Sequence, residues 1–413
     1  MNLRTMDRRL FTILMIVFVQ MVGAAMIMPI LPLYAKNEFA MSPREITWLG
    51  TAFFAAQFLA GPYLGRLSDR IGRMPVLIVS QIGTALSFAL LAVAPSVAIL
   101  FIARIVDGIT GGNIIVAQAY ITDITPREKR TEALGYIFAI FGVGFIVGPA
   151  LGSILAAAFG PRMPYIMAAV AAGLVVLLTW LTLDETVTDE QQASNRTARK
   201  ANFSAQQILS NAPLLFVLVI GFVAQFGFGL LQSTFSLYGE AVLFAGYSQQ
   251  AALVGIGLLL ASIGLGQVFT QTWLLRRLLK RFDEVSLVLL GIAARTIAML
   301  TFAAITSPWL GMPASILFAV GMGITMPSLQ SIATTTVDDS ARGGVLGIFQ
   351  STTSLAIIFS TLVAGIIFDV APTLPYWIGA LLTLAAGAPA FFLSQQLRHG
   401  SRDTRRGGRP SVG

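Results

Sequence analysis

The chain has 413 residues, of which 56% are hydrophobic and only 11% are charged. Soluble domains carry roughly 25% charged residues, whereas apolar runs of about 20 residues, long enough for a membrane helix, recur along this chain. The composition therefore excludes an ordinary soluble protein and predicts an all-α polytopic membrane protein.

The formal net charge of +8 raises nucleic acid as a possible partner. The basic residues, however, gather in the short links between apolar runs, so we expect no nucleic-acid binding. The chain has no cysteine, and its single histidine, His399, lies in the polar C-terminal tail. A thiolate or histidine metal site is therefore excluded, and we expect neither a metal nor a cofactor.

Twelve membrane spans fit the apolar runs, with approximate limits of 10–34, 45–64, 75–94, 97–120, 130–157, 163–183, 212–238, 249–273, 285–306, 309–335, 343–368 and 375–396. An even number of spans places both termini on one side. Most of the 27 lysines and arginines lie on that same side, which the positive-inside rule assigns to the cytoplasm. We expect a multi-pass protein of the inner (plasma) membrane with both termini cytoplasmic.

The sequence divides into a first bundle of six spans (1–184), a polar linker (185–210), a second bundle (211–397) and a basic tail (398–413). The segment that begins at Arg130 is repeated in the segment that begins at Arg342, and both reach a Leu-Gly pair four residues on. Such a repeat predicts two bundles around a pseudo-two-fold axis, with a substrate site between them at mid-membrane. The tail is expected to be disordered and to contact anionic lipid headgroups.

Two segments have the form Ser/Thr-Pro-Arg-Glu, which is typical of a capping box with proline in the first helical turn. They are Ser42–Glu45 and Thr125–Glu128. The pattern predicts that the second and fifth spans begin at these positions.

A charged, glycine-bearing link separates the second and third spans, and its distinctive residues are Gly65, Asp69, Arg70, Gly72 and Arg73. Gly65 removes a side chain where two helices would approach closely. Arg70 and Arg73 can pair with Asp123 at the end of the fourth span. The alternative is a plain positive-inside turn, which does not require an aspartate and two glycines at this spacing.

Several motifs occur in order along the first half: Gly65-x-x-x-Asp69-Arg70-x-Gly72-Arg73, Leu100-x-x-x-Arg104-x-x-x-Gly108, Gly144-x-x-x-Gly148-Pro149-x-x-Gly152 and Gly23-x-x-x-x-Met28-Pro29. Together they resemble the major facilitator superfamily, and within it the twelve-span drug–proton antiporters, closest to the tetracycline-exporter-like branch. The resemblance implies the major facilitator fold and transport by alternating access. It also implies that the 65–73 link and Asp123 form a cytoplasmic gate, latched when the cavity faces outward.

The glycines Gly144, Gly148 and Gly152 are spaced four residues apart, so they share one face of the fifth span, and Pro149 can kink the helix there. The resemblance identifies these four residues as the antiporter motif, in which Ser153 stands where the family often has another glycine. The alternative is ordinary packing of small residues, and both interpretations can hold together.

Intramembrane charges are expensive and usually functional, and away from their ends the spans contain only Arg104, Asp107 and Arg295. Arg104 and Asp107 are three residues apart on one helix, so they can pair. A carboxyl group at mid-membrane can bind and release protons, which makes this pair the candidate for proton coupling; a static ion pair is the alternative. Arg295 either answers an anionic group or snorkels along a peripheral span.

Amides and aromatic residues suit a pocket for an amphipathic ligand. The candidate substrate-binding residues are Gln20, Phe53, Gln57, Asn113, Gln118, Phe138, Phe141, Gln225, Phe228, Gln232, Arg295 and Gln330. The resemblance implies that the tetracycline-exporter branch carries an aspartate at the place of Gln20 and further aspartates in spans 3 and 9. In this chain span 3 has no acidic residue and span 9 carries Arg295. The missing carboxylates argue against a tetracycline–metal substrate.

We expect a secondary active transporter that exports amphipathic, drug-like small molecules in exchange for protons. Its partners would be the substrate, protons and membrane lipid, and it would act as a monomer. Two alternatives stay open: an exporter or facilitator of a sugar, lipid or other metabolite, and a non-transporting receptor or scaffold on the same fold. None of the four lysines follows a glycine, so no Walker A loop is present, and we expect no enzymatic activity.

Overall fold

The structure is a computed structural model that describes residues 8–111, 113–126, 129–186, 211–337 and 342–406. Within these ranges every regular element is a helix. The first half of the chain forms α1 (Arg8–Phe39), α2 (Pro43–Ile71), α3 (Arg73–Val93), α4 (Val97–Thr110), α5 (Asn113–Ile124), α6 (Arg130–Phe159) and α7 (Met163–Thr182).

The second half begins with α10 (Ala212–Tyr238) and the π-helix η3 (Gly239–Leu243), followed by α11 (Gln249–Phe269), the π-helix η4 (Thr270–Leu274) and α12 (Leu275–Leu278). It continues with α13 (Glu284–Ala304), α14 (Pro308–Thr335), α15 (Arg342–Val370), α16 (Leu374–Ala385) and α17 (Gly387–Arg406). The predicted spans fall on these helices.

Eleven helical stretches among the described residues are long and apolar enough to cross a membrane. The second predicted span falls on α2, which has 29 residues but is less apolar because charged residues lie near both of its ends. The capping box predicted at its start is present, since Ser42 and Glu45 exchange hydrogen bonds of 2.9 and 3.4 Å. The equivalent box at Thr125–Glu128 includes residues 127–128, which lie outside the described ranges. The eleven long apolar helices make the chain a multi-pass membrane protein.

The span expected at 97–120 falls on α4 and α5, which together make one stretch long enough to cross a membrane, Val97–Ile124. Gly111 forms a turn after α4, and its carbonyl accepts a bond of 3.3 Å from the Gln57 side chain; residue 112 lies outside the described ranges. One expectation about the end of the chain is wrong. The tail expected to be disordered from residue 398 is helical as far as Arg406. No proline interrupts α17 between Gln395 and Arg406, so the helix continues beyond the apolar run.

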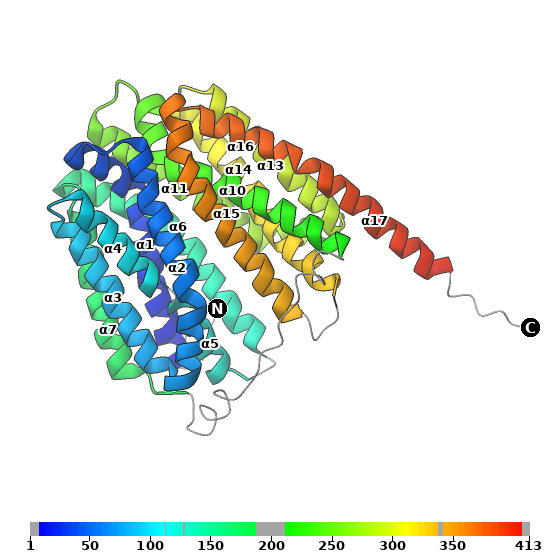
Figure 1. Ribbon diagram of the computed structural model, residues 1–413, viewed down its shortest axis with the longest axis horizontal. Coiled ribbons are helices and arrows are strands. Elements are labelled where there is room, and N and C mark those ends of the chain that lie inside the picture. The colour runs from blue at the N-terminus through cyan, green and yellow to red at the C-terminus, as the bar shows by residue number, and fades with distance from the viewer. Residues whose placement is uncertain (1–7, 112, 127–128, 187–210, 338–341, 407–413) are drawn as a thin grey trace, which may run out of the picture.

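Figure 1 shows α1 to α7 on one side of the molecule and α10 to α17 on the other. The two halves contact each other mainly where α6 meets α11 and where α2 meets α15. We call the face where α2 ends and α3 begins the basic face, and the face where α1 ends and α2 begins the opposite face. The two groups of helices diverge toward the basic face (Figure 1). The pseudo-two-fold axis and the domain limits stay predictions.

Polar contacts join the halves near the opposite face. An ion pair of 2.6 Å links Lys36 of α1 to Glu240, which projects from the π-helix η3. Between α2 and α15 the contacts are Thr51 Oγ1 to Thr361 Oγ1 at 3.0 Å, Trp48 Nε1 to the Leu362 carbonyl at 3.2 Å and the Gly365 amide to Thr47 Oγ1 at 3.1 Å. In this structure the halves are thus closed on each other at the opposite face.

Candidate functional site

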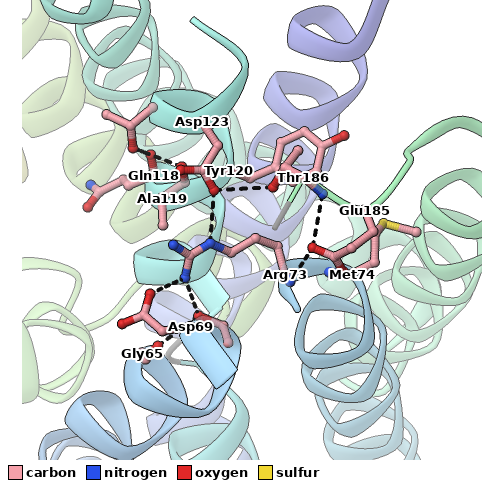
Figure 2. A network of polar contacts seen from close by, with 12 residues as sticks. Gly65, Asp69, Arg73, Met74, Gln118, Ala119, Tyr120, Asp123, Glu185 and Thr186 are labelled. Carbon is pink, nitrogen blue, oxygen red and sulfur yellow. Dashed lines mark hydrogen bonds and ion pairs between the residues drawn. The ribbon is translucent and has the colours of Figure 1, made fainter. Parts of the chain in front are cut away.

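Arg73, the first residue of α3, is the centre of a polar cluster on the basic face (Figure 2). Its side chain is largely buried and donates from Nη1 to Asp69 Oδ1 at 2.6 Å and from Nε to Asp123 Oδ2 at 3.0 Å. Nη1 also donates to Ser68 Oγ at 2.7 Å. One guanidinium group therefore joins the basic ends of α2, α3 and α5. The sequence allowed either arginine to reach Asp123; Arg73 does so, while Arg70 is exposed.

The two glycines of the link have different roles. Gly72 connects α2 to α3 with a φ of +105°, a conformation that residues with a Cβ rarely adopt. A Cβ at this position would also collide with the carboxylate of Glu185. The close approach expected at Gly65 is absent, because a Cβ there would lie 3.8 Å from Ile115, an ordinary contact distance. The Gly65 carbonyl instead accepts a bond of 2.8 Å from Ser68.

Arg104 and Asp107 form an ion pair of 2.6 Å in α4, as their spacing predicted. Both side chains are buried, at 7% and 6% exposure, and the Arg104 guanidinium lies 4.1 Å from the centre of the Phe53 ring. α4 begins at Val97 on the opposite face, so at ~1.5 Å per residue Asp107 lies ~15 Å deep, near the middle of a ~30 Å hydrocarbon core. The pair thus supplies a protonatable group at mid-depth.

The three glycines of α6 face α1 at very short range. A Cβ on Gly144 would lie 2.8 Å from the Met21 Cβ, and one on Gly148 would lie 2.5 Å from the Ala25 Cβ. A Cβ on Gly152 would approach a carbonyl of α1 to 3.0 Å. These glycines therefore let the backbones of α6 and α1 approach closely, which is how small residues pack membrane helices.

Another face of α6 contacts α11 in the second half. A Cβ on Gly257 would lie 2.5 Å from the Ser153 Cβ and 2.7 Å from the Pro149 carbonyl, and one on Gly264 would lie 2.7 Å from the backbone of Phe145. Serine replaces a glycine of the family pattern at position 153, and the partner helix supplies a glycine opposite it. α6 is thus tightly packed both within its own half and across the interface between halves.

Comparison with known proteins identifies the family. The sequence model of the Major Facilitator Superfamily matches residues 13–269 and 243–413. The chain belongs to the Major Facilitator Superfamily. It is 32% identical to the class H tetracycline resistance protein of Pasteurella multocida over 97% of this chain and 98% of that protein. It is 26% identical to multidrug resistance protein 1 of Bacillus subtilis over 90% and 95% of the two chains.

Solved structures agree on the fold. The nucleoside transporter NupG superposes with a TM-score of 0.77, at 13% identity, over 93% of this chain and 99% of that chain. A bacterial homologue of the human lysosomal transporter Spinster superposes with a TM-score of 0.71, at 17% identity, over 94% and 96%. The superpositions show the major facilitator fold. The family match and the curated relatives make the chain a transporter rather than an enzyme.

One of the predicted binding residues contacts the other half. Gln232 of α10 approaches the Met28 sulfur of α1, with 3.8 Å between Nε2 and Sδ. Phe228, one turn earlier on α10, stacks on Phe318 of α14 within the second half, with ring centres 6.3 Å apart. Gln225 is partly buried on α10.

Other predicted binding residues contact their own half, or only their burial is described. Phe53 and Gln57 of α2 contact Arg104 and the end of α4. Gln118 and Phe141 are partly buried and Gln330 is exposed, whereas the side chains of Asn113 and Phe138 lie outside those that the structure describes.

Gln20 faces α3 and α7 rather than the second half. It lines a cavity of about 10 Å³ together with Gln81 and Thr84. This face of α1 packs inside its own half, and the contact of Gln20 with substrate stays a prediction. A larger cavity of about 430 Å³ opens near the opposite face, between α1, α6 and α11, and its lining includes Tyr34, Glu38 and Gln250. None of the predicted binding residues lines it.

Arg295 of α13 is buried at 1% exposure, so the interpretation of a snorkelling arginine is wrong. Its Nη2 donates to the Ala224 carbonyl of α10, and its guanidinium lies 5.1 Å from the centre of the Phe318 ring. Its Nε and Nη1 have no hydrogen-bond partner among the described residues. No group of three or more histidine, cysteine, aspartate or glutamate side chains in the described ranges could hold a metal ion.

Proposed function

We propose that this chain is a secondary active transporter that exports amphipathic, drug-like small molecules in exchange for protons. The observation that carries the proposal is the buried Arg104–Asp107 pair at mid-depth of α4. A buried carboxyl group can alternate between a neutral, protonated form and a charged form stabilised by the adjacent guanidinium. Protonation of Asp107 would release Arg104, and that change can be linked to the exchange between the two openings of the transporter.

In this proposal the basic face is cytoplasmic, because it carries most of the positive charge, and both termini lie there. The structure then corresponds to the state open toward the cytoplasm. The Arg73 cluster acts as the cytoplasmic gate, and α6 is the helix along which the halves rotate. The protein acts as a monomer, uses the proton gradient rather than a cofactor, and contacts lipid through its outer helices.

The relatives' names point to tetracycline and to multiple drugs. We favour a broad amphipathic substrate class over a tetracycline–metal complex for this chain. Gln20 cannot exchange a proton or bind a metal cation as a carboxylate would. The amides and aromatic rings of α2 and α10 suit an amphiphile better than a metal complex.

The test is transport in proteoliposomes with an imposed pH gradient, with ethidium as the amphipathic probe and magnesium-bound tetracycline in a parallel assay. We expect Asp107→Asn to abolish gradient-driven ethidium accumulation while leaving ethidium binding intact. Asp369→Asn, which neutralises an exposed acid at the end of α15, is the matched control. Uphill transport by Asp107→Asn would refute the assignment, and saturable binding without any transport by the unmodified protein would favour a receptor. A thermal-shift screen would extend the substrate search, because a ligand of the folded state raises its apparent stability.

A further inference from the structure

Three consecutive residues after α7 contact three different helices on the basic face. We call Asp184, Glu185 and Thr186 the strap. The Asp184 side chain pairs with Arg9 of α1 at 2.7 Å, and its carbonyl accepts a bond of 3.0 Å from the Tyr120 hydroxyl of α5. The sequence assigned Glu185 and Thr186 to the linker between halves. In the structure the strap is bound to the gate instead (Figure 2).

Glu185 caps the N-terminus of α3. Its two carboxylate oxygens accept bonds of 2.8 Å from the Arg73 amide and 3.0 Å from the Met74 amide, although it lies 112 residues from Arg73 in the sequence. The first amides of a helix lack partners inside the helix and carry partial positive charge, so an acceptor carboxylate stabilises them. α3 has no cap of its own, because Gly72 precedes it and its first turn contains no acidic residue.

Gly72 is the local feature that admits this cap. Its positive φ turns the chain sharply between α2 and α3, and its missing Cβ leaves the space that the Glu185 carboxylate fills. A side chain at position 72 would displace Glu185 and strain the backbone at once. The second glycine of the family pattern therefore serves, in this chain, to seat an acid that comes from the end of α7.

Thr186 completes the connection. Its hydroxyl donates to Asp123 Oδ2 at 3.1 Å, the same oxygen that accepts from Arg73 Nε at 3.0 Å. Glu185 thus holds the backbone amide of Arg73, and Thr186 holds the side chain of Asp123, which pairs with Arg73. The strap fixes both members of the Arg73–Asp123 pair.

We propose that Glu185 and Thr186 are positioning residues of the cytoplasmic gate, which hold Arg73 and Asp123 in place while the halves open and close. The inference rests on the proposed function, in which this cluster gates transport. Loss of the cap leaves the Arg73 amide without its acceptor and loosens the guanidinium, so the latched state forms less often. The substrate site is far from the strap and should not change.

The natural absence of cysteine makes the test direct. Nitroxide labels on Arg66→Cys and Leu346→Cys, both exposed near the basic ends of α2 and α15, report the distance between halves on that face. We expect Glu185→Ala to shift the distance distribution toward the open state and to lower the maximal transport rate about tenfold, with KM little changed. Glu185→Gln keeps an acceptor oxygen, so its effect should be smaller.

The matched control is Asp184→Asn, which removes the same charge one residue away but leaves the α3 cap intact. We expect it to behave like the unmodified protein, because Asp184 and Arg9 form an exposed pair. Equal behaviour of Glu185→Ala and Asp184→Asn in both the distances and the rates would overturn the proposal. If Glu185→Ala alters the distances but the unmodified protein transports no substrate, the positioning role of Glu185 holds and only the proposed function is refuted.

Discussion

Replacement of Gly148 by alanine tests the close packing of α6 on α1. The new Cβ would lie 2.5 Å from the Ala25 Cβ and 2.9 Å from the Val22 carbonyl, and both belong to helix α1 rather than to a flexible side-chain end. Overpacking of this kind costs ~1–3 kcal/mol. Alanine regains ~0.8–1 kcal/mol of helix propensity relative to glycine. The net expectation is a destabilisation of up to ~2 kcal/mol.

Gly135 offers a control on the same helix. It is exposed, and a Cβ added there would meet no atom within 4 Å. Gly135→Ala therefore gains only the helix propensity and should stabilise the protein by ~0.8–1 kcal/mol. The same chemical change, made 13 positions apart, is thus expected to have opposite signs.

Thermal unfolding in detergent, followed by the fraction of protein that stays monodisperse, measures both variants. We expect the midpoint to fall for Gly148→Ala and to rise for Gly135→Ala. Two variants that shift in the same direction, or a Gly148→Ala protein more stable than the unmodified one, would show that α6 and α1 do not pack as the structure has them. The interpretation of the antiporter motif as a close helix contact would then fail.

Three further changes test separate parts of the molecule. Asp69→Asn weakens the 2.6 Å partner of Arg73, so the maximal transport rate should fall severalfold in proteoliposomes with KM unchanged; an unmodified rate would contradict the gate. Glu240→Gln removes the ion pair with Lys36 at the opposite face. Because partly exposed ion pairs contribute ~0–1 kcal/mol, spin labels placed across that face should show at most about a fivefold gain of the state open there. High salt should have the same effect on the unmodified protein. Arg295→Met replaces a buried cation by an apolar side chain of similar length, so the melting temperature should stay equal or rise, by the equivalent of up to ~4 kcal/mol. A clear drop would show that the contacts of Arg295 with the Ala224 carbonyl and the Phe318 ring outweigh the cost of burying its charge.

The fold could be predicted because a membrane restricts the possible structures. Each crossing needs a long helix that satisfies its own backbone, so apolar runs translate directly into spans. The turn at Gly111 was not predicted, because one glycine inside an apolar run hardly changes the hydropathy. The π-helices η3 and η4 were also missed, because a single extra residue in a turn leaves no mark in the hydropathy.

The candidate site was predictable where the partners are close in sequence. The spacing of Arg104 and Asp107 places both on one helix face, and the structure pairs them. Glu185 was missed because its partners are backbone amides of a helix 112 residues away, which no side-chain pattern reveals. The one available signal was Gly72, since a helix that begins after a glycine lacks a cap of its own and must find an acceptor elsewhere.

In the repeat of six spans, the turn at residues 276–284 corresponds to the 65–73 link, and its contacts favour placing the proposed gate in the first half. Near residues 276–284 the basic residues are kept, but the contacts are local: Arg277 lies 3.8 Å from the centre of the Trp273 ring, one helical turn earlier. Glu284 accepts a bond of 2.6 Å from Ser331 and so ties α13 to α14 without an arginine. A guanidinium that stacks on its own helix cannot hold three helix ends together as Arg73 does. Among these described contacts, the network of carboxylates around one arginine is found only at the first turn. Opening and closing of the basic face should therefore depend on Asp69, Asp123, Glu185 and Thr186, and tolerate neutral substitution of Arg277.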